Sequence, residues 1–172
     1  IPHSLQTIAD GTTYNDNAAG VFSHNTNLTK VVFQGEDTQI GSYAFYGCSA
    51  LSQVTLPKGI TTISAATFMG CSSLSSIALP ESLAVIKGGA FFGCGLESIV
   101  FPQSLQIIAD AVDKNGLPNY DYHGAFENNY KLTKITIPDK VTSIGSWAFE
   151  QCTSLSEVNI PEGLTTIGAG AF

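Results

Sequence analysis

Apolar and polar positions recur in the same order, with a period of about 23 residues, along most of the chain. A proline marks the same point of the pattern in successive periods. These prolines are Pro57, Pro80 and Pro102, followed after a longer interval by Pro138 and Pro161. A fixed period of this length, with apolar residues in fixed columns, predicts a solenoid in which each coil covers the apolar face of its neighbour.

Each period predicts two short extended segments and a turn that places an aromatic residue in the core. Apolar and polar residues alternate before the proline, as in "LSSIALP", which predicts a strand with one buried face. The proline ends this strand because it has no N–H group for a ladder. The sequence after the proline, "VTSIG" in one coil, predicts a second extended segment that ends in a turn at a glycine. A small residue and a phenylalanine then pack inward, and these phenylalanines are Phe45, Phe68, Phe91, Phe126, Phe149 and Phe172.

These columns resemble the BspA-like leucine-rich repeats, also called the treponemal type, with the pattern "C-x-x-L-x-x-L-x-L-P-x-x-L-x-x-I-G-x-x-A-F". The resemblance covers essentially the whole chain. It implies a β-rich, right-handed solenoid of ~23-residue coils with a parallel β-sheet on the concave face. It also implies a secreted or cell-surface protein of bacteria or protists that binds other proteins, in some cases as an adhesin for host matrix proteins. We expect one such domain over residues 1–172, with about six coils and a partial one, inside a longer protein.

Two intervals between repeat marks are longer than the period. One runs from Pro2 to Gln34, where a proline is expected, and the other runs from Pro102 to Pro138. We assign the extra residues to insertions at 11–19 and 112–124. They follow the nearly identical texts "LQTIAD" and "LQIIAD", so both insertions are expected to leave their coils at the same point and to project from the same side.

Aromatic residues near the insertions are the candidate partner-binding residues. Tyrosine and tryptophan bring a large contact area at a low cost in conformational entropy, which makes them frequent in recognition surfaces. The candidates are Tyr14, Tyr43, Tyr120, Tyr122, His123 and Trp147. Two alternatives stay open. The insertions are tolerated surface loops, or the partner binds the concave strand face, whose outward residues are small and weakly charged.

Four cysteines and two asparagines share one column, just before the first strand of each coil. They are Asn25, Cys48, Cys71, Cys94, Asn129 and Cys152. Both residue types are small and can donate a hydrogen bond to a backbone carbonyl at a tight bend, so we expect a structural ladder. Coils about 5 Å apart would also bring neighbouring cysteines within reach of a disulfide. Reduced thiols, disulfides and a metal site remain as alternatives in that order, since a zinc site would want paired C-x-x-C spacing.

Composition limits the classes of partner. Charged residues make up only 12% of the chain, and the formal net charge is −7. All seven basic residues are lysine, so no guanidinium group is present to grip a phosphate at two points or to stack on a base. We therefore expect no nucleic-acid partner. No apolar run approaches the ~20 residues of a membrane-spanning helix, and we expect no membrane insertion of this chain.

No motif for catalysis or for a cofactor is present in the sequence. None of the three histidines lies in a text typical of an activated nucleophile or a metalloprotease. The text "DKNG" resembles part of a calcium loop but lacks its other acidic residues. We expect a non-enzymatic protein-recognition module without cofactor or metal, at the cell surface or secreted as the resemblance implies. A structural spacer and a carbohydrate-binding module are the alternatives, and exposed end coils predict end-to-end self-association.

Overall fold

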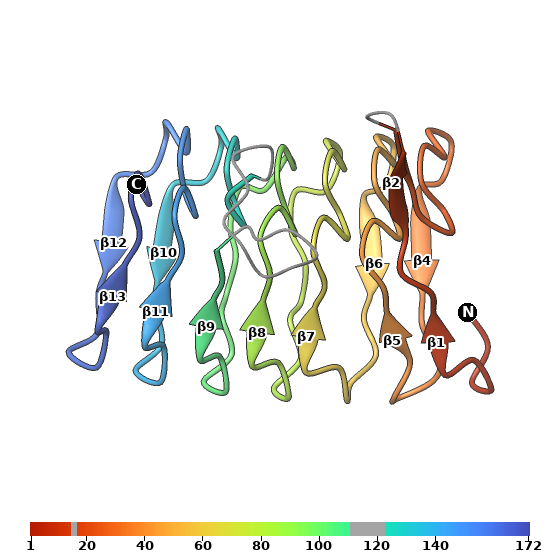
Figure 1. Ribbon diagram of the computed structural model, residues 1–172, viewed down its shortest axis with the longest axis horizontal. Helices are drawn as coiled ribbons and strands as arrows, with labels where there is room; N and C mark the ends of the chain where they lie inside the picture. Colours follow the sequence, from red (N-terminus) through yellow and green to blue (C-terminus); the bar gives the residue numbers. More distant parts are fainter. Residues whose placement is uncertain (15–16, 111–122) are drawn as a thin grey trace.

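The computed structural model is a β-solenoid whose coils stack side by side along one axis (Figure 1). The structure describes residues 1–14, 17–110 and 123–172, and no helix occurs among them. Strands of successive coils pair residue by residue at equivalent points of the repeat, as in the pairs Lys30↔Gln53 and Lys134↔Glu157. The described ladders between coils are all parallel. The expected β-rich solenoid is therefore confirmed.

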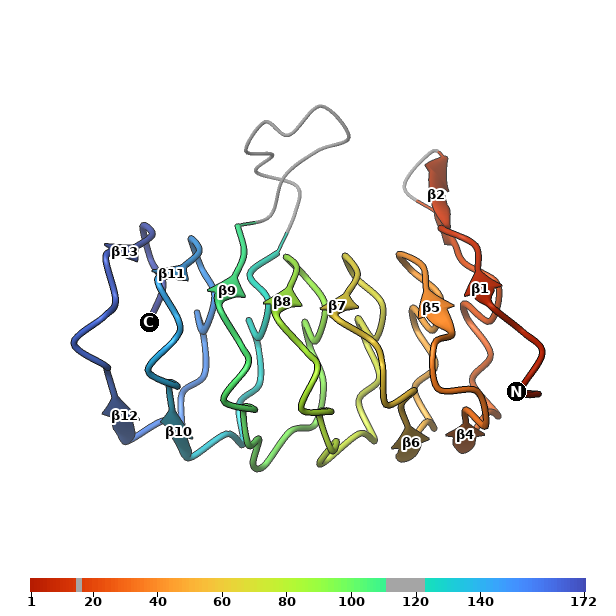
Figure 2. The same cartoon turned by 90° about the horizontal axis from the view of Figure 1, so that it is seen from below.

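Two rows of short strands run along two different faces of the solenoid (Figure 2). The first row precedes the proline position and contains β4 (Lys30–Val32), β6 (Gln53–Thr55), β10 (Lys134–Thr136) and β12 (Glu157–Asn159). The second row follows it and contains β1 (Thr7–Ile8), β5 (Gln39–Ile40), β7 (Thr62–Ile63), β8 (Val85–Ile86), β9 (Ile107–Ile108), β11 (Ser143–Ile144) and β13 (Thr166–Ile167). Strand residues alternate between core and solvent, as buried Val31 between its two exposed neighbours shows.

The longer sheet is formed by the second row. Five of its strands form one sheet in the order β13-β11-β9-β8-β7, and β1 and β5 form a separate pair. The first row contains only the pairs β4-β6 and β10-β12 among the described residues. The expectation of a strand before the proline in every coil is wrong for two coils, where residues 76–78 and 98–100 form no ladder. The turn between Cys94 and Leu96 is one position shorter than its counterparts. Glu97 N still donates to Ser75 O at 2.9 Å, the same contact that Ser52 N makes with Thr29 O between two regular coils, so the register before these segments is kept.

The first insertion contains an antiparallel hairpin that the sequence pattern did not predict. It consists of β2 (Thr12–Tyr14) and β3 (Asn17–Ala19), in which Thr12 pairs with Ala19. The hairpin projects from the solenoid beside the second row of strands (Figure 2). Its ladder is internal to the insertion, so the hairpin adds a separate element to the repeat rather than another coil.

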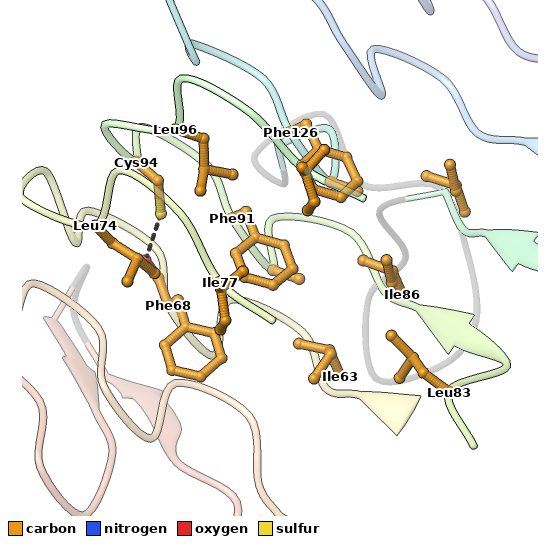
Figure 3. Packing of buried hydrophobic residues seen from close by; sticks show 14 of the residues in the cluster. Ile63, Phe68, Leu74, Ile77, Leu83, Ile86, Phe91, Cys94, Leu96 and Phe126 are labelled. Carbon is orange, nitrogen blue, oxygen red and sulfur yellow. Dashed lines mark hydrogen bonds between the residues drawn. The ribbon is translucent and has the colours of Figure 1, made fainter. Parts of the chain in front are cut away.

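A stack of phenylalanine rings fills the core from the first coil to the last. Neighbouring ring centroids are 5.1–5.5 Å apart, and their planes differ by no more than 13°. The rings belong to Phe22, Phe45, Phe68, Phe91, Phe126, Phe149 and Phe172. Phe22 could not be predicted from the repeat pattern, because Val21 replaces the small residue before it. Figure 3 shows three of the rings in line, with leucine and isoleucine columns around them.

Candidate interaction surface

Both insertions leave the solenoid at the end of a second-row strand. Asp10 follows β1 and Asp110 follows β9, and the chain returns to the coil at Gly20 and Gly124. The described ends of the two insertions lie on the same side of the molecule (Figure 2). We call this side, from the end of each second-row strand to the cysteine column, the insertion side.

An aspartate at the base of each insertion joins its coil to the next coil. Asp10 Oδ1 accepts the backbone N–H of Ser42 at 2.6 Å, and Asp110 Oδ1 accepts that of Ser146 at 2.5 Å. The hydrogen bonds from the Ser42 backbone and side chain lower the pKa of Asp10, so its charged form is favoured. Two segments far apart in the sequence therefore use the same contact.

A glycine at the return point of each insertion lets the following coil approach closely. A Cβ atom at Gly20 would lie 1.9 Å from Tyr43 O, and one at Gly124 would lie 1.7 Å from Trp147 O. No side chain fits at these distances, so both positions require glycine. In each case the approached residue is the aromatic residue of the next coil. The structure thus links the first insertion to Tyr43 and the second insertion to Trp147.

Tyr43 and Trp147 have left-handed backbone conformations, with φ angles of 58° and 55°. Other coils place Gly89 or Gly170 at this position, with φ angles of 66° and 63°. An L residue in this conformation costs about 1–2 kcal/mol compared with glycine. Such strain persists where other interactions of the residue compensate for it. Among the described coils, an aromatic residue occupies this column only in a coil that follows an insertion.

The side chains of both aromatic residues are half-buried on the insertion side. The Tyr43 ring meets the edge of Tyr46, with centroids 6.1 Å apart. The Trp147 indole lies over Gly170 of the next coil, where an added Cβ would be 2.7 Å from Cδ1. Scaffold residues therefore help to position each aromatic side chain.

His123, at the end of the second insertion, packs on the preceding coil. Its ring centroid lies 3.7 Å from that of Phe92. Its Nδ1 lies 3.3 Å from Glu127 Oε1, and Glu127 Oε2 accepts the N–H of Gly124 at 2.8 Å. Glu127 therefore holds His123 and the returning backbone in one arrangement.

For the remaining candidate residues the structure gives the backbone position of Tyr14 alone. Tyr14 lies in β2 of the hairpin, and Tyr120 and Tyr122 lie outside the described residues. Tyr43 and Trp147 stand at equivalent positions four coils apart, so they do not share one pocket. The insertion side is therefore an extended surface rather than a single cleft.

A second group of residues on the insertion side was not predicted from the sequence. Tyr46, Met69 and Phe92 directly follow the core phenylalanine in three consecutive coils and are half-buried. The texts "AFYGC", "TFMGC" and "AFFGC" contain the signal, an apolar residue between the core phenylalanine and a glycine. Residues in a turn do not alternate regularly between core and solvent, so their exposure does not follow from the pattern alone.

The cysteine column forms a line of hydrogen bonds to the backbone of neighbouring coils. The Sγ atoms of Cys48, Cys71, Cys94 and Cys152 donate to the carbonyls of Phe22, Phe45, Phe68 and Phe126 at 3.0–3.3 Å. All four cysteines are free and buried. Burial raises the pKa of every one of these thiols, to about 12 for Cys94 and about 11 for Cys152. They therefore stay protonated at neutral pH, which makes them poor nucleophiles and poor metal ligands.

Asn129 occupies the same column in the coil of the second insertion and is fully buried. Its Nδ2 donates to Phe91 O and Phe126 O, each at 2.8 Å. Its Oδ1 accepts the backbone N–H of Leu96 at 3.3 Å. Asn25, the asparagine of the first coil, is exposed. The two asparagines of the column thus differ in environment.

Three further features of the described residues concern metal sites, membrane helices and the end of the solenoid. Within the described ranges, no group of three or more histidine, cysteine, aspartate and glutamate side chains is arranged to hold a metal. The same part of the chain contains no helix of the length and apolarity that crossing a bilayer requires. A hollow of about 360 Å³ opens on the last coil and is lined in part by Leu155, Val158 and Phe172. Self-association through such an end face stays a prediction.

The repeat geometry agrees with the similarity of this chain to known proteins. The family model described as the BspA-type leucine-rich repeat region matches residues 1–115 and 122–172, in six copies. A solved leucine-rich repeat protein from Bacteroides ovatus is 27% identical with a TM-score of 0.62, over 95% of this chain and 48% of that chain. One from T. pallidum is 25% identical with a TM-score of 0.57, over 95% of this chain and 73% of that chain. The chain thus spans about half the length of the B. ovatus structure, and no curated protein matches it.

Proposed function

Since the chain belongs to the BspA-type leucine-rich repeat family, we propose that it is a non-enzymatic protein-recognition module of a bacterial cell-surface or secreted protein. Stacked repeats present extended surfaces that suit the binding of other proteins. The proposed partner is an extracellular-matrix or plasma protein of a host, and the chain would act as an adhesin.

The proposed contact surface is the insertion side, and the observation that carries this proposal is the repeated anchoring of the insertions. A loop that is merely tolerated needs no fixed geometry at its base. Here the same aspartate–serine hydrogen bond and the same glycine–aromatic approach recur at both insertions. The proposed contact residues are Tyr14, Tyr43, Tyr120, Tyr122, His123 and Trp147.

Shortening both insertions is expected to weaken partner binding at least tenfold without unfolding the solenoid. The variant removes residues from 11–19 and 112–124 until both coils have the period of the others. Biolayer interferometry would measure binding to fibronectin, fibrinogen, laminin, collagen and plasminogen, and circular dichroism would check the fold. A matched control carries Thr55→Glu and Thr136→Glu on the exposed face of the first strand row, and its affinity is expected to stay within twofold of the original.

Unchanged affinity of the shortened variant, together with loss in the control, would move the contact surface to the first strand row. The absence of binding to every protein of the panel would favour a structural spacer instead.

A further inference from the structure

The geometry points to a second, more specific feature of the insertion side: a strip of apolar side chains that ends in the Glu150 carboxylate and fits a basic partner segment. The strip is the column that directly follows the core phenylalanines. It contains Ser23, Tyr46, Met69, Phe92, Glu127 and Glu150. The inference rests on the proposed function, because it names the part of the partner that this side would bind.

The apolar part of the strip lies in the three coils between the two insertions. Tyr46, Met69 and Phe92 are all half-buried, so each presents part of its side chain to solvent. The first insertion belongs to the coil before Tyr46, and the second belongs to the coil after Phe92. Partly exposed apolar side chains at equivalent positions of neighbouring coils are typical of an interaction site.

Aromatic contacts fix both ends of the apolar part. Tyr46 meets His24 edge-on, with centroids 5.0 Å apart, and meets Tyr43 at 6.1 Å. At the other end, Phe92 contacts His123 at 3.7 Å. These contacts restrict the side chains before any partner arrives, which reduces the entropy lost on binding.

Glycines line one side of the apolar part of the strip. On one side the neighbouring residues are Gly47, Gly70 and Gly93, all with positive φ angles. A Cβ added at Gly93 would meet no heavy atom within 4 Å. Small residues therefore flank Met69 and Phe92 on the scaffold, and a partner side chain can reach their exposed parts.

The two ends of the strip differ in charge. The second coil after Phe92 contains Glu150 in the same column, whereas the mostly buried Glu127 of the first already contacts His123 Nδ1 and accepts the Gly124 N–H. Among the described residues of the insertion side, Asp10 and Asp110 add two more carboxylates, whereas Lys87 is the single cation. A partner with lysine or arginine beside its apolar residues matches this order, and an acidic partner is repelled.

The length of the strip defines the size of the partner segment. Successive core rings lie 5.1–5.5 Å apart, so the four coil spacings from Tyr46 to Glu150 amount to about 20 Å. An extended chain covers this distance with about six residues. The inferred partner element is therefore a short protein segment with two or three apolar side chains followed by basic ones.

A designed peptide tests the inference without knowledge of the natural partner. The probe is a fluorescein-labelled peptide with leucine and tryptophan in one half and lysine in the other, and fluorescence polarisation measures its binding to the full chain. A second peptide replaces each lysine by glutamate. We expect the basic peptide to bind at least tenfold more tightly than the acidic one, and the difference to shrink at high salt.

Variants of the strip locate the binding. Met69→Glu and Glu150→Lys are each expected to weaken the binding of the basic peptide at least fivefold. Ala78→Glu and Glu162→Lys make matched changes at exposed positions on other faces, and they are expected to leave the affinity within twofold. Equal binding of the two peptides, or equal losses in strip and control variants, would overturn the inference. If Met69→Glu leaves the binding of matrix proteins unchanged, the inference is overturned while the proposed function stands. If the peptide binds at the strip but no matrix protein binds, only the adhesin role is removed.

Discussion

Replacing Phe91 by alanine lowers the free energy of unfolding by about 3–5 kcal/mol. The Phe91 ring is fully buried and stacks on Phe68 at 5.5 Å and on Phe126 at 5.2 Å. Its removal leaves a cavity between two coils whose cores depend on each other. Since the whole domain is stabilised by about 5–15 kcal/mol, the loss is a large fraction of its stability. Urea denaturation followed by circular dichroism measures the change.

The matched control is Phe172→Ala at the end of the same stack. Phe172 is 50% exposed and has one stacked neighbour, Phe149, at 5.5 Å. Its removal leaves no enclosed cavity, so the expected loss is only about 1 kcal/mol. Equal losses at Phe91 and Phe172 would contradict the view that the continuous phenylalanine stack holds neighbouring coils together.

Asn129→Leu is expected to destabilise the protein by about 2–4 kcal/mol, because it removes three hydrogen bonds in the core. In most coils the leucine after this column donates its backbone N–H to the column residue's own carbonyl, as Leu51 N donates to Cys48 O. The shorter turn before Leu96 lacks that bond, and Asn129 Oδ1 accepts the Leu96 N–H instead. A leucine at position 129 leaves this N–H buried without a partner.

Asn129→Cys provides the graded control. A cysteine restores one donor, as at the other positions of the column, but does not supply a strong acceptor for Leu96 N. Its expected effect is about 1–2 kcal/mol, between the original chain and Asn129→Leu. Thermal and urea unfolding of the three chains measures the order. If Asn129→Cys were as stable as the original, the acceptor role of Asn129 would be wrong.

The repeat and most of its core could be predicted from the sequence, because every coil must bury the same columns of apolar residues. Apolar residues in a fixed column must be buried by the next coil, so the core residues of one period indicate those of all the others. The rings from Phe45 to Phe172 follow from this rule. Phe22 did not, since Val21 breaks the local text. The longer sheet in the second row also escaped prediction, because ladder formation depends on hydrogen bonds between coils rather than on the residues of one coil.

The insertion side could be predicted only in part. The shared text before the two insertions indicated a common exit point, and Tyr43 and Trp147 stood out as aromatic residues in a column of small ones. The bond from Asp110 to Ser146, by contrast, joins residues of different coils, and no local pattern specifies it. The exposure of Met69 and Phe92 depends on the turn geometry beside Gly70 and Gly93, which becomes visible only in three dimensions.

The most direct test of the recognition account is to cover one face at a time with a polymer and measure binding to the matrix-protein panel. Because the four native thiols are buried and protonated, a maleimide-linked polyethylene glycol can be attached selectively to an introduced surface cysteine. Lys87→Cys places it on the insertion side between the insertions, and Ser76→Cys places it on the first-row face; both positions are exposed. The account predicts that the polymer at position 87 abolishes binding and that the polymer at position 76 leaves it unchanged. Binding that survives at position 87 and is lost at position 76 would contradict the account.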